Sequence, residues 1–124
     1  EDRFSILYSE GVAKGKITVN EFVDMIATNA AKVFGLFPQK GTIAIGSDAD
    51  IVIFDPNVKR EISAKTHHMN VDYNPYEGWE VTGEPVTVLV RGEYVIKEKE
   101  FVGVLGSGRY IKRQLKTTAE TIKI

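Results

Sequence analysis

The stretch "GTIAIGSDADIVIFDP", Gly41 to Pro56, separates a helical pattern before it from strand patterns after it. Its second half, "DIVIFD" from Asp50 to Asp55, is a short apolar run with three β-branched residues, bounded by acidic residues and Pro56. Such a run predicts a strand that is buried on both faces. The alternation in "TIAIG", Thr42 to Gly46, predicts another short strand.

Three carboxylates in this stretch raise the question whether it forms part of an active site. A cluster such as Asp48, Asp50 and Asp55 can carry out acid–base chemistry. Carboxylates beside a strand also commonly accept hydrogen bonds from the amides of a turn. We favour the structural role, in which Gly46 relieves backbone strain, Asp50 fixes the turn and Asp55 ends the strand.

The residues before this stretch predict helices. "TVNE", Thr18 to Glu21, is a capping box, because the hydroxyl of Thr18 and the carboxylate of Glu21 can each satisfy a backbone amide of the other residue. The helical spacing of Phe22, Met25, Ile26, Ala30 and Val33 predicts a helix at about 19–34. Gly35 suits the position after its end, and Pro38 prevents its continuation. A shorter helix is predicted at about 2–14.

The residues after Pro56 predict further strands and one long loop. "KREIS", Lys59 to Ser63, is expected to be a short partner strand. Val86 to Val102 is expected to be a hairpin with Arg91-Gly92 as its turn, where Gly92 supplies a positive φ. Ala64 to Pro85 shows little periodicity and is predicted to be a loop with a functional or interface role.

Composition excludes several classes of protein. The 124 residues suit one domain or a lobe of a larger one, and the net charge of -1 offers no field that would attract nucleic acid or anionic lipid. No apolar run approaches the roughly 20 residues needed to span a bilayer. The chain has no Cys, which excludes disulfides and thiolate metal sites and fits a cytoplasmic location. The acidic start is not a signal peptide and lacks Met, so we expect a fragment or a processed product.

The segment from Thr18 to Pro56 resembles the closing segment of the amidohydrolase superfamily. The resemblance rests on the spacing of Thr28, Asn29, Ala31, Gly35, Gly41, Ile43, Gly46, Ala49, Asp50, Ile51 and Val52. The stretches "EDRF", "YNPYEGWEVTGEPVTVLVRG" and "GSGRYIKR" are further similar to the C-terminal portion of the D-hydantoinase and dihydropyrimidinase family.

This resemblance implies an α/β parent fold, a (β/α)8 barrel with a small β-sandwich. Residues 1–37 would be the terminal barrel helices. Residues 38–105 would be the C-terminal part of the sandwich, with its long loop at 64–85. Residues 106–124 would be a tail that is mobile or contacts another subunit.

The resemblance also implies the activity, a metal-dependent hydrolysis of the cyclic amide in hydantoins or dihydropyrimidines. The two divalent metal ions, expected to be zinc, would be bound upstream of Glu1, as would the substrate. No catalytic, substrate-binding or metal-binding residue is therefore assigned to this chain. Its expected partners are the remainder of the polypeptide and, in a cytoplasmic homotetramer, other copies. Neither nucleic acid nor a membrane is expected.

Four other motifs each allow a functional and a structural interpretation. His67-His68, with Asp72 nearby, could ligate a metal but is expected to make loop hydrogen bonds. Gly103 to Arg109 lacks the context of a phosphate-binding loop and is expected to be a hinge. Asn74 to Trp79 is expected to dock the sandwich on the barrel rather than line its rim. Arg109 to Lys116 is basic and is expected to be a subunit-contact arm.

Two other functions remain open on the sequence alone. The first is a scaffold or assembly protein, because some relatives of the hydantoinases keep the fold and lose the metal ligands. The second is a free-standing β-rich interaction module, which would unfold cooperatively as a monomer. An incomplete sandwich would leave an unpaired strand edge, so we expect the isolated chain to associate.

Overall fold

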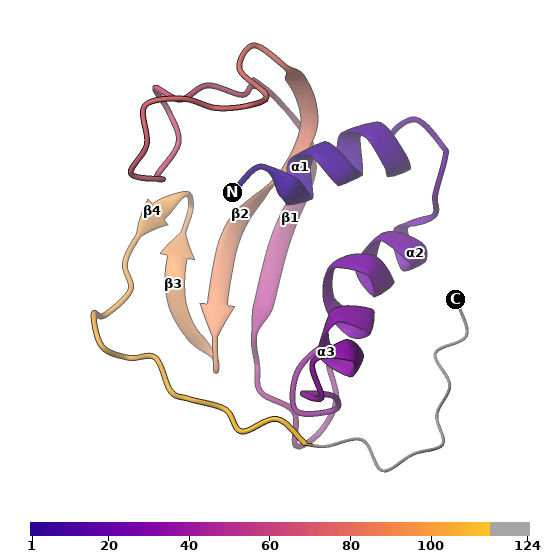
Figure 1. Cartoon of the computed structure of the whole chain (residues 1–124), viewed down its shortest axis with the longest axis vertical. Coiled ribbons are helices and arrows are strands. Elements are labelled where there is room, and N and C mark those ends of the chain that lie inside the picture. The colour runs from indigo at the N-terminus through magenta and orange to yellow at the C-terminus, as the bar shows by residue number, and fades with distance from the viewer. Residues whose placement is uncertain (115–124) are drawn as a thin grey trace.

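The computed structural model describes residues 1–114. Helices at the start of the chain lie on one side of an antiparallel sheet whose strand order is β1-β2-β3-β4 (Figure 1). The helical elements are α1 Arg3–Leu7, η1 Tyr8–Val12, α2 Val19–Val23, η2 Asp24–Thr28 and α3 Asn29–Val33. The strands are β1 Ile51–Glu61, β2 Glu80–Val90, β3 Glu93–Lys97 and β4 Glu100–Phe101. This small sheet with its helices is the fold of the described residues.

Both predicted helices are present, and each contains a π-helical turn, η1 or η2. The capping box is formed as predicted, since the Glu21 amide donates to Thr18 Oγ1 at 3.2 Å and the Thr18 amide donates to Glu21 Oε2 at 2.7 Å. After α3, Gly35 has a φ of +68°. A glycine adopts this left-handed conformation without the steric cost that other residues meet, which explains why the helix ends here.

Strand β1 is longer than predicted. It pairs with β2 from Ile51 opposite Leu89 to Glu61 opposite Glu80. "KREIS" is therefore wrong as a separate partner strand, because Lys59 to Glu61 continue β1. The register shifts between Asp55 and Lys59. Pro56 lies in this irregular stretch and cannot donate to the ladder, so a local pattern that stops at Pro56 misses the continuation of the strand.

The strand predicted for Thr42–Gly46 is absent from the described structure. This segment is a loop, in which the Ser47 amide donates to Ala44 O at 3.1 Å and the Asp48 amide donates to Gln39 O at 2.9 Å. Ile43 and Ile45 are both exposed. Glycines with positive φ, Gly41 and Gly46, bound the segment and turn the chain at both ends.

The prediction that Asp50–Asp55 is buried on both faces is also wrong for the described residues. Ile53 is 51% exposed and Val52 is 42% exposed. Strand β1 is at the edge of the sheet, because β2 is its only neighbour in residues 1–114. Apolar side chains on an edge strand stay exposed when no further layer covers them.

The hairpin turn is confirmed, but the hairpin begins earlier than predicted, and its second arm turns again at Glu98-Lys99 and divides into β3 and β4. The turn residues Arg91 and Gly92 have φ values of +52° and +81°, and β2 and β3 flank them. Such a pair of positive φ values suits the twist of a two-residue hairpin. Because β2 starts at Glu80, the predicted loop at 64–85 extends too far, and Glu80–Pro85 are strand residues.

An aromatic cluster joins the helices to the sheet. The ring of Tyr8 lies 5.8 Å from the ring of Phe22 and 4.8 Å from that of Phe54, measured between centroids. Gly83 of β2 lies beneath this cluster, and a Cβ at Gly83 would lie 2.5 Å from Tyr8 Cδ1 and 2.7 Å from Phe54 Cε1. The absence of a side chain at Gly83 lets the aromatic rings approach the strand closely.

Candidate functional site

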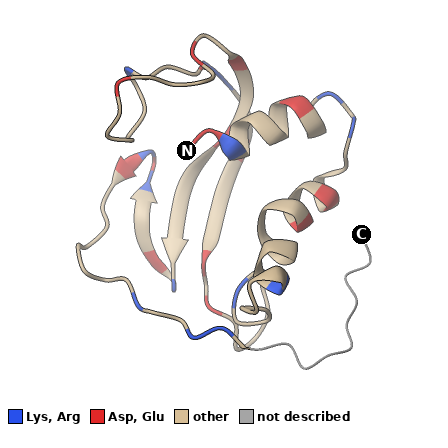
Figure 2. Cartoon of the chain, in the orientation of Figure 1, with Lys and Arg blue, Asp and Glu red and all other residues tan. Residues whose placement is uncertain are grey.

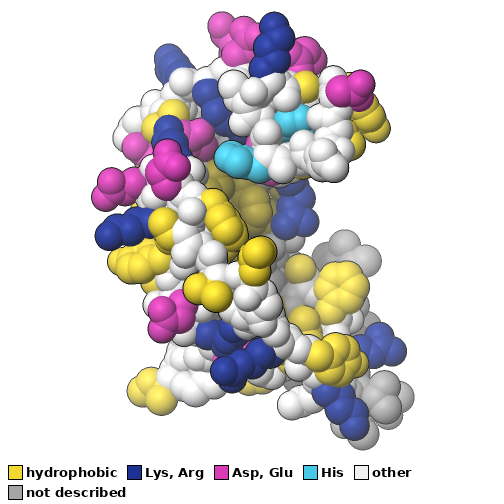
Figure 3. All heavy atoms as spheres, turned by 90° about the vertical axis from the view of Figure 1, so that its left-hand side faces the viewer, with side chains coloured by type: hydrophobic (Ala, Val, Ile, Leu, Met, Phe, Trp, Pro, Cys, Tyr) yellow, Lys and Arg dark blue, Asp and Glu magenta, His cyan; other side chains and the backbone are white. Residues whose placement is uncertain are grey.

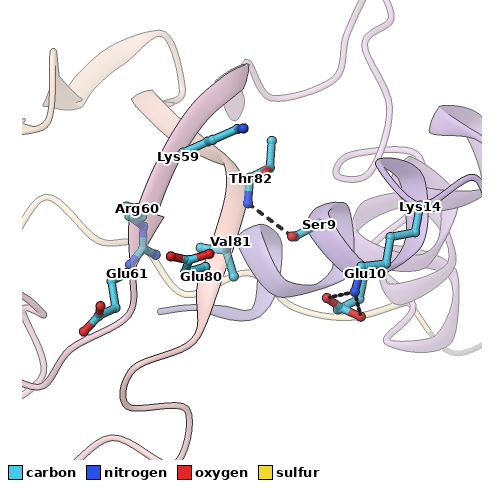
Figure 4. A pocket seen from close by; sticks show the side chains of 9 residues that line it. All are labelled: Ser9, Glu10, Lys14, Lys59, Arg60, Glu61, Glu80, Val81 and Thr82. Carbon is cyan, nitrogen blue, oxygen red and sulfur yellow. Dashed lines mark hydrogen bonds and ion pairs between the residues drawn. The ribbon is translucent and has the colours of Figure 1, made fainter.

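A charged groove lies where the first helical segment crosses β1 and β2 (Figure 4). Its volume is about 450 Å³, and its lining residues are Ser9, Glu10, Lys14, Lys59, Arg60, Glu61, Glu80, Val81 and Thr82. The Thr82 amide donates to Ser9 Oγ at 3.1 Å, and Lys14 pairs with Glu10 at 2.6 Å. These contacts fasten the helical segment to β2 and stabilise the first helix. The lining contains no His, the residue type that most often serves as a general base, and the hydroxyl oxygen of Ser9 accepts the hydrogen bond from the Thr82 amide.

Beside the groove, a network of charged side chains connects the start of the chain to the sheet. Arg60 Nη2 lies 2.9 Å from Asp2 Oδ1, and Arg60 Nε lies 3.2 Å from Glu84 Oε2. Lys99 contacts the other oxygen of Glu84. Asn74 Nδ2 donates to Asp2 Oδ2 at 2.8 Å. The network thereby joins α1, the 62–79 loop, β1, β2 and the turn before β4.

Asp2 stays ionised in this network. Its residue is 5% exposed, and burial alone would raise the pKa of its carboxyl. The hydrogen bonds from Asn74 and Arg60, with the charge of Arg60, outweigh burial and lower the pKa below its ordinary value. A carboxyl with a lowered pKa and partners on both oxygens is unsuited to act as a general acid or base at neutral pH. Asp2 is a structural anchor.

Asp50, just before β1, has the turn role that the sequence favours. Asp55 lies within β1, so the prediction that it ends the strand is wrong, because the strand continues past Pro56 to Glu61. Asp50 Oδ1 accepts from the Arg91 amide at 2.8 Å, and Asp55 Oδ1 accepts from the Asn57 amide at 2.9 Å. Lys40 contacts Asp50 and lies 3.0 Å from Asp48. The hydrogen bond from Lys40 lowers the pKa of Asp48. For Lys40, burial opposes the charge, but the bonds to Asp50 and Asp48 raise its pKa. Lys40, Asp48 and Asp50 thus form one ion-paired group, and Asp55 is held separately by the Asn57 amide.

Motif residues of α3 and the following loop meet at a tight junction. Thr28 Oγ1 donates to Gly41 O at 2.8 Å. A Cβ at Gly41 would lie 2.5 Å from Ala31 Cβ and 3.0 Å from Ala27 O. Gly41 therefore allows the loop to lie directly on the helix. Thr28, Ala31 and Gly41 are among the residues that carry the family resemblance, and their spacing brings them together in this packing contact.

The two histidines, both in the loop at 62–79, make different contacts. His67 binds within this loop, and His68 binds the first residue of the chain. His67 Nε2 lies 2.9 Å from Val71 O, and His68 Nδ1 lies 3.3 Å from Glu1 Oε2. Within residues 1–114, no group of three or more His, Asp or Glu is placed to hold a metal ion. The loop hydrogen bonds agree with the role expected for these histidines, and Asp72 does not complete a site with them.

Sequence reasoning missed the network of Asp2, Arg60, Asn74 and Glu84. Asn74, in the "NPYEGW" motif, is buried, and its Oδ1 also accepts from the Tyr76 amide at 2.9 Å. The partners Asp2 and Asn74 are 72 positions apart in the chain. No local pattern links residues at that separation, and the only signal was the run of turn-forming residues around Asn74.

A second hollow, about 700 Å³ in volume, is largely apolar and lies between the helices and the start of β1. Its lining includes Val23, Ile26, Phe34, Ile43 and Val52. Several of these side chains are exposed, including Phe34 at 62%. Apolar residues of β3, β4 and the segment after them are exposed as well, and they include Tyr94, Phe101, Val104 and Leu105. Apolar side chains also gather on the face seen in Figure 3.

Charge is spread without a single-sign face. Lys and Arg are interspersed with Asp and Glu over the helices, strands and loops of residues 1–114 (Figure 2). Among the described residues, no helix has the length and hydropathy required to cross a bilayer. The described residues therefore have exposed apolar areas that suit contact with protein.

Comparison with known proteins identifies close relatives. The profile of the Amidohydrolase family matches residues 3–95. The chain is 68% identical over 113 residues to a D-hydantoinase of Geobacillus stearothermophilus, covering 91% of this chain and 24% of that protein. It is 49% identical to a dihydropyrimidinase of Rattus norvegicus over 92% of this chain and 22% of that protein. The crystal structure of a dihydropyrimidinase from Brevibacillus agri matches with a TM-score of 0.92 and 61% identity, covering 96% of this chain and 26% of that one. The chain thus spans about a quarter of the length of its relatives.

Proposed function

Because the chain belongs to the amidohydrolase family, we propose that it is the C-terminal structural part of a metal-dependent D-hydantoinase. The intact protein would hydrolyse the cyclic amide of hydantoins or dihydropyrimidines. The observation that carries this proposal is the 68% identity over 113 residues to a D-hydantoinase. An identity of this size across nearly the whole chain supports a shared substrate class.

The described residues contribute architecture to that activity. Asp2, Arg60, Lys40 and Asp48 are held in ion pairs, His67 makes a hydrogen bond within its loop, and the helix–loop junction is tightly packed. The exposed apolar areas would be covered by the rest of the polypeptide. We place residues 1–37 at the end of a (β/α)8 barrel, residues 38–105 in a β-sandwich and residues 106–124 in a tail.

The divalent metal ions of the family do not fit this part of the chain. Residues 1–114 hold no group of three acidic or histidine side chains suited to a metal, and the whole chain has no Cys. The proposal therefore assigns metal and substrate binding to residues preceding Glu1. The remaining expectations, a homotetramer in the cytoplasm, belong to this same proposal.

The test uses the full-length polypeptide that carries these residues. Purified protein is assayed for ring opening of hydantoin and dihydrouracil, with its metal content measured in parallel. Hydrolysis by a metal-loaded protein supports the proposal. A folded, full-length protein that hydrolyses neither substrate, under conditions in which a known D-hydantoinase is active, refutes it.

A scaffold function is the alternative, since the described residues would serve it equally well. The two functions differ in the residues before Glu1. A His-x-His pair there, in a protein that binds metal, favours the enzyme. A full-length chain without those ligands favours the scaffold.

A further inference from the structure

The chain after β4 returns to the end of the helices. It leaves the sheet at Phe101, passes below the strands in Figure 1 and reaches the region after α3. Two hydrogen bonds attach it. Arg91 Nη2 donates to Ser107 O at 2.6 Å, and the Gln114 amide donates to Gly35 O at 2.8 Å. We name residues 107–114 the strap.

Both attachments involve backbone atoms of the strap. The carbonyl of Ser107 and the amide of Gln114 would be present with almost any side chain at these positions. The side chain of Tyr110 is 92% exposed, so it does not hold the strap in place. Ile111 is half-buried and lines a hollow with Gln39, Asp48 and Arg91, so the strap is held by its backbone, by this side chain and by the site that receives them.

Gly35 meets two separate demands at this site. The first demand is a left-handed backbone, since its φ is +68°. Asn or Asp could also meet this first demand. The second is space, because a Cβ at Gly35 would lie well inside 3.0 Å of the Gln114 carbonyl oxygen. Only glycine lets the backbone of the strap approach this closely.

Arg91 connects the strap to the loop between α3 and β1. Its amide donates to Asp50 Oδ1 at 2.8 Å, and Asp50 contacts Lys40 of that loop. The guanidinium of Arg91 holds Ser107 at the same time. Contacts thus run from Gly35 through the loop and the hairpin turn to the strap, and back to Gly35.

We propose that the strap holds the α3–β1 junction against the hairpin turn, with Gly35 as its docking site. The strap and the junction are then expected to open together. Substitutions on the receiving side should release the strap, whereas Tyr110→Ala, which changes an exposed side chain, should leave it bound.

The test compares Gly35→Ala with Gly15→Ala in the full-length polypeptide. Gly15 follows the first helical segment and has a φ of +67°, and a methyl group there would have no atom within 4 Å. It therefore matches the backbone strain of Gly35 without the collision. Native trypsin cleavage after Arg109, Lys112 and Arg113 reports release of the strap. Hydrogen exchange of peptides over residues 36–50 reports opening of the junction.

We expect the rate of trypsin cleavage in the strap and the rate of hydrogen exchange at residues 36–50 to be at least about tenfold higher in Gly35→Ala than in Gly15→Ala. Equal rates for the two variants would overturn the proposal. If Gly35→Ala unfolds the whole protein, the variant Arg91→Asn tests the proposal instead. Asn tolerates the positive φ at this position and lacks the guanidinium that binds Ser107. Faster cleavage in Arg91→Asn with a normal melting temperature supports the strap, and wild-type cleavage refutes it.

Discussion

Gly41 offers the sharpest test of the junction between α3 and the following loop. In Gly41→Ala, the new methyl would lie 2.5 Å from Ala31 Cβ, 3.0 Å from Ala27 O and 3.2 Å from Thr28 Cα. Two of these atoms belong to helix backbone and cannot rotate away. The junction must therefore open, or the loop must shift.

The expected cost has two parts. The φ of Gly41 is +81°, and a left-handed conformation costs an L-residue about 1–2 kcal/mol. Forcing a methyl into a packed contact costs about 1–3 kcal/mol more. Gly46→Ala isolates the first part, because Gly46 has a φ of +89° and open space at the methyl position.

Local hydrogen exchange measures the difference between the two variants. The Asp48 amide donates to Gln39 O within this loop, so its exchange reports opening of the loop. In the full-length polypeptide, an additional 1–3 kcal/mol corresponds to exchange about 5- to 150-fold faster in Gly41→Ala than in Gly46→Ala. Equal exchange in the two variants would refute the close packing of Gly41 on the helix.

Substitutions test three further features. Thr18→Ala removes the capping box and should destabilise the α2 region by about 1 kcal/mol, seen as faster exchange at residues 19–23, whereas Thr18→Ser should preserve it. Asp2→Asn should lower the free energy of unfolding by about 1–3 kcal/mol at pH 7. Since the folded pKa of Asp2 is lowered, its contribution is present above the ordinary value of 3.8 and is lost as the pH falls through the lower folded value. The free energy of unfolding is measured at pH 7 and at decreasing pH below 4. It should fall more in the wild type than in Asp2→Asn over this range, and an equal fall in both proteins would contradict the role of Asp2. The double variant His67→Ala, His68→Ala should leave the metal content of the full-length protein unchanged by elemental analysis, and loss of one ion per chain would contradict the loop role.

Local signals in the sequence predict the parts of the fold that depend on neighbouring residues. The capping box from Thr18 to Glu21, the glycine after α3 and the Arg91-Gly92 turn all act over a few positions, and the structure confirms each. The resemblance in the helix–loop–strand segment also rests on residues close in the chain, and three of them, Thr28, Ala31 and Gly41, meet in one tight contact.

Local sequence patterns do not predict the features that depend on residues far apart in the chain. The alternation at Thr42–Gly46 does not produce a strand, because no strand pairs with it in residues 1–114. The length of β1 depends on pairing with β2 across the irregular stretch at Pro56. The network at Arg60 joins residues more than fifty positions apart, and such contacts leave no periodic trace.

These residues are proposed to support a hydantoinase without supplying its catalytic groups, and a chimera tests that role most directly. Residues 1–114 replace the matching segment of the Geobacillus stearothermophilus D-hydantoinase, and hydantoin hydrolysis and bound metal are measured beside the unmodified enzyme. We expect a chimera with full metal content and a kcat/KM within about tenfold of the parent enzyme. A folded, metal-loaded chimera that fails to hydrolyse hydantoin would contradict this role.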